Sequence, residues 1–235
     1  MHRVLLPSLV VAGLVGASAL AVAHGIADEQ VAGVNGRLNA ITAARIATGI
    51  APPQQTLAEL DRDLSDAISL APRNGLYAMA HARLLRTPRQ APDGAVTEDL
   101  NGAQAAAQRA LVRLPSSPYA WADYALVADS LNAQGKLPGG NAELFRAMRQ
   151  AMQLGGREPT VALAVLDLGL ANAADLDTPT KAVVAMALNL LVVNAPGDAL
   201  AVGQRRGGLK MVCEHQAIAK HDLCARFRDQ KNVLM

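Results

Sequence analysis

The fold of this chain is decided by a stretch in its second half that reads Ala147-Met148-Arg149-Gln150-Ala151-Met152-Gln153-Leu154-Gly155-Gly156-Arg157-Glu158-Pro159. It has the pattern of a helix end, a glycine break and the proline-marked start of a second helix. Two earlier stretches share this small-apolar pattern before a break, and they read Ala67-Ile68-Ser69-Leu70-Ala71-Pro72 and Ala110-Leu111-Val112-Arg113-Leu114-Pro115. The matching alanines are 43 and 41 residues apart. Recurrence at a few tens of residues indicates an array of helical hairpins.

The hairpins are predicted over 64–85, 104–131 and 144–170. Their spacing exceeds the roughly 34 residues of a tetratricopeptide repeat, so the connections between them must be longer. Proline-containing stretches at 86–94 and 132–140 supply that length. Helix starts are indicated by a polar residue before proline at Ser117-Pro118, Glu158-Pro159 and Thr178-Pro179, and by Asn141 after two glycines.

Composition independently favours helices. Hydrophobic residues make up 51% of the chain but aromatic residues only 3%, and much of the apolar content is alanine. Alanine has the highest helix propensity, whereas sheet cores draw on β-branched and aromatic side chains. The net charge of +2, from 22 basic and 20 acidic residues, gives no concentrated basic face for nucleic acid. The densest basic run, 204–210, is interpreted as a solvated connection between helices.

Residues 4–23 carry no charge and are mostly apolar. A helix of this length rises about 30 Å, the thickness of a hydrocarbon core. Arg3 precedes the segment, and Asp28 and Glu29 are the first charges after it. The positive-inside rule therefore puts the N-terminus in the cytoplasm and the body in the periplasm. Two interpretations stay open: an uncleaved anchor in the inner membrane, and a secretory signal cleaved after Ala23 that leaves a soluble periplasmic protein.

The predicted protein is all-α, with an N-terminal transmembrane or signal helix at 1–23. An amphipathic helix and a Pro-rich linker follow at 24–55, where Ala51-Pro52-Pro53 ends the helix. Residues 56–175 form an antiparallel, tetratricopeptide-like array of helical hairpins. Beyond Thr178 the repeat pattern fades, and 176–235 are predicted to form a C-terminal helical cap that shields the last hairpin.

The body resembles the VpsP family of polysaccharide biosynthesis proteins over about residues 60–215. The resemblance rests on the N-terminal apolar segment and on four stretches, which are 67–74, 114–122 with Leu114-Pro115-Ser116-Ser117-Pro118-Tyr119-Ala120-Trp121-Ala122, 147–159, and 166–170 followed by Thr178-Pro179. It implies an accessory or scaffold protein of bacterial exopolysaccharide assembly or export, which binds a protein partner at the periplasmic face of the inner membrane. The alternatives are a glycan-binding module and a general tetratricopeptide-like assembly factor of another envelope complex.

A helical array offers a concave surface lined by the first helix of each hairpin, and here that surface is predicted near Arg62, Arg109 and Arg146. Tyr119, Trp121 and Tyr124 lie close together in sequence at one helix start. These three aromatic side chains either form a platform on which a sugar ring stacks or pack one hairpin on the next. The three arginines, Tyr119 and Trp121 are the candidates for contact with the partner or with polysaccharide.

Near the C-terminus Cys213, His215, His221 and Cys224 form the densest group of metal-ligand residue types. In an exported protein the two cysteines are expected to form a disulfide, with a zinc site or free thiols as alternatives. A straight helix would hold them about 16 Å apart, whereas a disulfide needs Cα atoms within about 7 Å. A disulfide therefore requires a turn between the cysteines, predicted near 219–221.

No catalytic motif is recognised in the sequence, and an enzyme is not predicted. The carboxylate pairs that glycoside hydrolysis would require are poorly placed, because Asp61 and Asp63 point apart on a helix. Asp175 and Asp177 precede a predicted helix, where capping explains them. His24 and His81 are interpreted as isolated surface or boundary side chains. No cofactor is expected.

Overall fold

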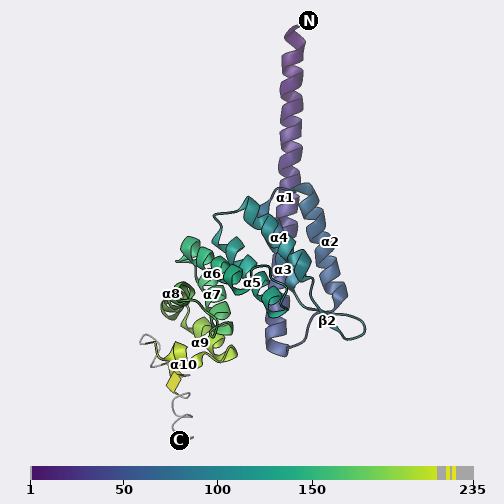
Figure 1. Cartoon of the computed structure of the whole chain (residues 1–235). Helices are drawn as coiled ribbons and strands as arrows, with labels where there is room; N and C mark the ends of the chain where they lie inside the picture. Colours follow the sequence, from purple (N-terminus) through teal and green to yellow (C-terminus); the bar gives the residue numbers. More distant parts are fainter. Residues whose placement is uncertain (1, 216–220, 223, 226–235) are drawn as a thin grey trace, which may run out of the picture. The chain divides into compact units, whose positions relative to one another are not determined.

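The computed structural model describes the backbone of residues 2–215, 221, 222, 224 and 225, and their side chains apart from 2–17, 19 and 20. Within this part of the chain there are ten α-helices and one two-stranded antiparallel sheet (Figure 1). The all-α fold class predicted from composition and periodicity is confirmed.

The chain divides into two compact units, Met1–Arg113 and Leu114–Met235. The first contains α1 (His2–Thr48), α2 (Gln54–Leu70), α3 (Gly75–Arg86), β1 (Arg89–Gln90), β2 (Val96–Thr97) and α4 (Leu100–Arg113). The second contains α5 (Pro118–Ala133), α6 (Gly140–Gly155), α7 (Pro159–Ala171), α8 (Thr178–Asn194), α9 (Pro196–Arg205) and α10 (Leu209–Cys213). The breaks predicted at Pro72, Pro115 and Gly156 all separate two helices. The hairpin predicted over 104–131 takes one helix from each unit, so its packing stays a prediction, as do the domain boundaries.

The core of the first unit is a seam of apolar side chains from α1, α2 and α3. Its members recur every three or four residues along each helix, which places them on one face. They are Ala27, Val31, Val34 and Leu38 of α1, Leu57, Leu60, Leu64 and Ala67 of α2, and Tyr77, Ala80 and Leu84 of α3. The amphipathic character predicted for 24–50 is therefore real up to Ile41, which packs against this core, whereas Ile46 and Ile50 are exposed.

A partly buried hydrogen bond joins α1 to α3. The Tyr77 hydroxyl donates to Oδ1 of Asp28 at 2.6 Å, and the Tyr77 side chain is almost fully buried. Burial, reinforced by the neighbouring Asp28 carboxylate, raises the pKa of Tyr77 to about 12. The tyrosine therefore stays protonated and keeps donating over the physiological pH range.

The long connection between α3 and α4 contains the small sheet, which periodicity did not predict. Arg89 pairs with Thr97 and Gln90 with Val96, and the turn between them includes Gly94 at φ +83°. The backbone N–H of Gln90 also donates to the Pro52 carbonyl at 2.9 Å, which attaches the hairpin to the α1–α2 linker. Strands of two residues are too short to show an alternating pattern, so the sequence carried no signal for them.

In the second unit each helix from α5 to α9 packs on the next helix, and α5, α6 and α7 also pack on the next helix but one. Gly169 lets α7 and α8 approach closely, because a Cβ atom there would collide with the Val184 side chain. At Gly203 a Cβ would lie 2.9 Å from Cγ2 of Val212, so this glycine allows similar contact between α9 and α10. Small residues therefore set the helix spacing in this unit.

The predicted helix starts are mostly confirmed, with two corrections. Ser117 caps α5 by accepting from the Ala120 N–H, and Pro118 and Pro159 occupy first positions of α5 and α7. At α8 the cap is Asp177, whose carboxylate accepts from the Thr180 N–H at 2.8 Å, and Thr178 already lies inside the helix. At α6 the cap is Gly139, so the prediction for Asn141 was wrong; its Oδ1 accepts from Asn132 instead. In the first case the carboxylate of Asp177, one residue before the helix, reaches an exposed N–H donor; in the second a left-handed glycine begins the helix.

Helix α1 runs without a break from His2 to Thr48, so the apolar segment and the amphipathic segment form one helix. Figure 1 shows its N-terminal half extending beyond α2, α3 and α4. Most side chains of the span predicted at 4–23 lie outside the described residues. Among the residues that could be searched, no helix is long and apolar enough to cross a membrane. The anchor stays a prediction.

We expect Leu60→Ala to lower the free energy of unfolding by about 2–5 kcal/mol, because Leu60 is 0% exposed in the α1–α2–α3 core and its loss leaves a cavity. Leu70→Ala on the same helix, where the side chain is 40% exposed, is the control and should cost far less. Urea denaturation followed by far-ultraviolet circular dichroism measures both. Equal destabilisation by the two variants would contradict the seam as the core of this unit.

Candidate functional site

The five residues predicted to contact a partner fall into both units. Arg62 and Arg109 are exposed on α2 and α4 of the first unit, and Tyr119, Trp121 and Arg146 belong to α5 and α6 of the second. The structure brings Trp121 and Arg146 together. It supports two separate candidate sites, one around Trp121 and one around Arg109, and the single concave surface predicted through all three arginines stays a prediction.

The first candidate site is built around the Trp121 ring at the start of α5. The indole Nε1 donates to the Pro115 carbonyl at 2.8 Å, which fixes the ring against the preceding turn. Tyr124, one turn along the helix, meets the ring edge-on, with the ring centres 6.4 Å apart and the planes at 88°. The Arg146 guanidinium of α6 lies over the ring at 5.0 Å from its centre. This geometry is a cation–π contact.

Arg146 is itself held by Glu143. Its Nε and one terminal nitrogen donate to the two carboxylate oxygens at 2.9 and 2.7 Å, and the Tyr124 hydroxyl donates to the same carboxylate at 2.8 Å. The hydrogen bonds from Arg146, and then the one from Tyr124, hold the pKa of Glu143 below its usual value despite partial burial. The pKa of Arg146 is raised in turn by Glu143. The charge of this arginine is therefore neutralised within the second unit.

The position of Arg146 over the indole ring limits the ability of Trp121 to bind a sugar by stacking. A sugar ring that stacks on the covered face would first have to displace Arg146 from both Glu143 and the indole ring. Tyr119 does not join the cluster in a platform, because its hydroxyl donates to Oε2 of Glu158 at 2.7 Å, in the linker before α7. Of the two interpretations left open by the sequence, packing between helices explains these contacts better than a stacking platform.

The second candidate site is a cavity of about 320 Å³ between α2, α3 and α4. Its lining combines apolar and cationic groups, namely Ser65, Ile68, Pro72, Ala78, His81, Arg109 and Arg113. Arg109 and Arg113 lie one turn apart on α4 and share a face of the helix. Neither arginine has an acidic partner in the part of the chain that the structure describes.

His81 in this cavity corrects the interpretation of an isolated histidine. Its Nε2 lies 3.1 Å from Oδ1 of Asp61 on α2. The two residues are twenty positions apart, so only the packing of α2 on α3 brings them together. The neighbouring Asp63 faces Arg37 of α1 at 3.5 Å. Asp61 and Asp63, the two carboxylates considered as a catalytic pair for glycoside hydrolysis, therefore make separate contacts with other helices.

The cysteine prediction is confirmed: Cys213 and Cys224 form a disulfide with their Cα atoms 5.3 Å apart. Helix α10 ends at Cys213, as the geometric argument required, while residues 219 and 220 of the predicted turn lie outside the described residues. A zinc site with two thiolates is excluded in this state because both sulfur atoms are bonded to each other. His215 contacts Asn189 instead, with 2.8 Å between Nε2 and Oδ1.

The basic run 204–210 connects α9 to α10 and its charged side chains are exposed, as predicted, but two of its arginines also bind a carboxylate of α7. Arg205 donates to Oδ1 of Asp167 at 2.8 Å, and Arg206 donates to both oxygens of the same carboxylate at 3.0 and 2.6 Å. Burial raises the pKa of Asp167, but the hydrogen bonds from Arg206 and Arg205 outweigh it, so the pKa lies below its usual value. These hydrogen bonds hold α7 against the C-terminal end of α9.

In comparisons with known proteins, no family model, no curated protein and no solved structure matches this chain. In the described ranges there is also no group of three or more His, Cys, Asp or Glu side chains that could hold a metal ion. The site therefore has to be judged on its own geometry.

Sequence reasoning missed Arg113, Glu143 and Asp167. Glu143 precedes Arg146 by three residues, a spacing that predicts an ion pair on a helix and was available from the sequence. Arg113 follows Arg109 by four residues, which could have indicated a cationic pair. Asp167 had no such signal, because its partners are 38 and 39 residues away.

We expect Arg146→Gln to increase quenching of Trp121 fluorescence by acrylamide, because the guanidinium no longer covers the indole ring. The signal is specific, since Trp121 is the single tryptophan of the chain. Arg149→Gln on the same helix is the matched control, because its guanidinium binds Asp177 and Thr180. Equal quenching in the wild type and Arg146→Gln would show that the arginine does not shield the ring.

We expect Asp167→Asn to destabilise the chain near neutral pH by on the order of 2 kcal/mol, since two arginines lose their anionic partner. The folded-state pKa of Asp167 lies below the unfolded value, so its contribution is present above the unfolded pKa and is lost as the pH falls through the folded pKa. Denaturation curves of the two proteins should therefore converge in acid. Asp175→Asn, at an exposed position in the linker before α8, should show no such pH-dependent difference.

Proposed function

We propose that this chain is a non-enzymatic scaffold of bacterial exopolysaccharide assembly or export that binds an acidic segment of a protein partner. The resemblance of residues 60–215 to the VpsP family suggests the process. The partner would be a component of a polysaccharide assembly or export complex. The single observation that carries the binding mode is the pair Arg109 and Arg113 at the cavity between α2, α3 and α4.

The reasoning is electrostatic. Most of the arginines discussed above face a carboxylate of their own unit, as Arg37, Arg146, Arg149, Arg205 and Arg206 do. Arg109 and Arg113 are exposed and lack such a partner among the described residues. Two guanidinium groups beside an apolar cavity are suited to an acidic side chain flanked by aliphatic ones.

The packing of α5 to α9 on their next and next-but-one neighbours supports a tetratricopeptide-like array in the second unit. In such arrays each repeat contacts only its neighbours, which leaves extended surfaces free for another macromolecule. The uncharged segment at 4–23 supports a single anchor in the inner membrane with both units in the periplasm. A soluble periplasmic protein cleaved after Ala23 is the alternative.

The test is affinity purification of the tagged full chain from envelope fractions of its own bacterium. We expect components of a polysaccharide assembly or export complex to copurify, and Arg109→Glu with Arg113→Glu to reduce their recovery several-fold, because the partner would then face like charges. Arg157→Glu, at an exposed position outside the cavity, should leave recovery unchanged.

Recovery of unrelated cytosolic proteins alone, or an unchanged yield with the double variant, would contradict the proposal. Copurification of a different envelope complex would instead favour a general assembly factor. Saturable binding of isolated exopolysaccharide that quenches Trp121 would favour the glycan-binding module.

A further inference from the structure

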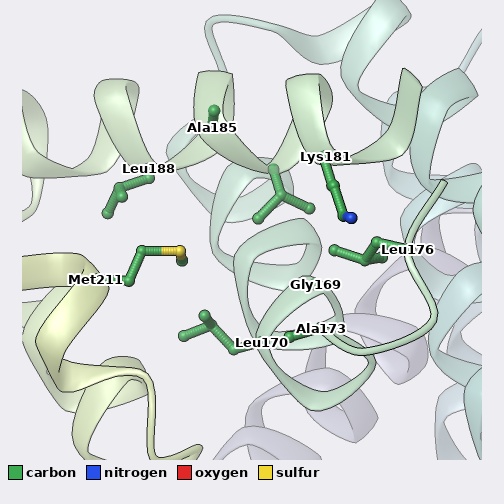
Figure 2. Close-up of a pocket in the computed structure, with 9 residues that line it drawn as sticks. Gly169, Leu170, Ala173, Leu176, Lys181, Ala185, Leu188 and Met211 are labelled. Atoms are coloured by element: carbon green, nitrogen blue, oxygen red, sulfur yellow. The ribbon is translucent and has the colours of Figure 1, made fainter. Parts of the chain in front are cut away.

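The second unit contains a pocket that the proposed function does not use. It has a volume of about 320 Å³ and lies between the end of α7, the α7–α8 linker, α8 and α10. Figure 2 shows Lys181 and Leu176 at one end, Leu188 and Met211 at the other, and Gly169 and Leu170 of α7, with Ala173 of the α7–α8 linker, opposite α8. Apart from Lys181, every lining side chain is apolar.

The walls of the pocket are firmly placed. Leu170, Leu176, Val184 and Leu188 are buried, so the interior is an aliphatic surface. The close approach of α7 and α8 at Gly169 fixes one wall. Gly208 fixes another wall. A Cβ atom at Gly208 would lie 2.7 Å from Cδ2 of Leu170, so Leu170 packs directly against the backbone of this glycine. The rim is formed by Ala173, Ala185 and Met211, which are exposed.

Lys181 places a single positive charge at one end of the pocket. It lies in the first turn of α8 and is exposed, and within the described ranges its ammonium group has no carboxylate partner. The nearest acidic residue in sequence, Asp177, already binds Arg149 and caps the helix. An apolar cavity with one cation at its end is complementary to a ligand with a hydrocarbon chain and a single anionic head.

We propose that this pocket binds an aliphatic carboxylate, with the hydrocarbon chain against Leu170, Val184 and Leu188 and the carboxylate beside Lys181. The volume is at the small end of ligand pockets, which favours one medium-length chain over a lipid with two. The proposal does not rest on the proposed function: the pocket and the Arg109 cavity belong to different units and can be tested separately.

The experiment titrates octanoate into the purified full chain in detergent-free solution. The Met211 methyl signal of protein labelled in its methionine methyl groups is followed by nuclear magnetic resonance and assigned with Met211→Leu. We expect a saturable shift, and a loss of affinity of at least tenfold in Ala185→Phe and in Ala173→Phe, whose rings fill the pocket from its rim. Ala182→Phe, exposed on the same helix but outside the lining, should bind as the wild type does.

The role of Lys181 is tested with a second pair of variants. We expect Lys181→Gln to weaken octanoate binding roughly threefold and to leave binding of neutral 1-octanol unchanged, while Lys181→Arg restores octanoate affinity. Absence of a saturable shift would overturn the proposal. So would equal loss in Ala182→Phe and Ala185→Phe, or wild-type affinity in both pocket-filling variants. Equal effects of Lys181→Gln on octanoate and octanol would overturn the assignment of the carboxylate to Lys181.

Discussion

Close contact between helices at small residues underlies the packing of both units. Val184 packs against the bare backbone at Gly169, and Val212 lies against Gly203 in the same way. In the first unit Ala27, Ala67 and Ala80 are buried in the seam between α1, α2 and α3. A small side chain removes little apolar area from water, so each contact stabilises only slightly and many are needed. The whole chain contains only six aromatic residues, two phenylalanines, three tyrosines and one tryptophan, so aromatic packing could not substitute for close contact at small residues.

Polar contacts between helices complete this packing and decide which charges remain outside it. Asp28 accepts a hydrogen bond from Tyr77, and Asp61 lies beside His81. Asp167 binds Arg205, the last residue of α9, and Arg206, which follows it. Arg109, Arg113 and Lys181 are among the cations that have no carboxylate partner among the described residues. These three line the two cavities described above.

The two cavities differ in a way that follows from their walls. The one between α2, α3 and α4 is lined by two arginines beside apolar side chains, so its field favours an anionic group over a hydrocarbon. The cavity between α7, α8 and α10 is lined by aliphatic side chains apart from one lysine at its end. Its third wall depends on α10, which ends at Cys213 of the disulfide. The bond to Cys224 therefore restrains the chain next to the wall that carries Met211.

Several features could be predicted because they depend on short stretches of sequence. Alanine content and the spacing of Val31, Val34 and Leu38 indicate helices with one apolar face, since a helix repeats every 3.6 residues. Pro118 and Pro159 mark helix starts because proline lacks the N–H that would be unpaired there. The disulfide was predicted from two cysteines in a chain expected to be exported, and the turn between them from the length of a straight helix.

The remaining features depend on which helix faces which, and a local pattern does not contain that information. His81 was interpreted as isolated because Asp61 lies on another helix, and Arg146 was assigned to a partner because its stacking on Trp121 depends on how α5 packs on α6. By itself the sequence determined the helices, most of their boundaries and the cross-link. Only the tertiary structure decided which charged side chains neutralise one another and where cavities form, because both depend on distances between residues far apart in the chain.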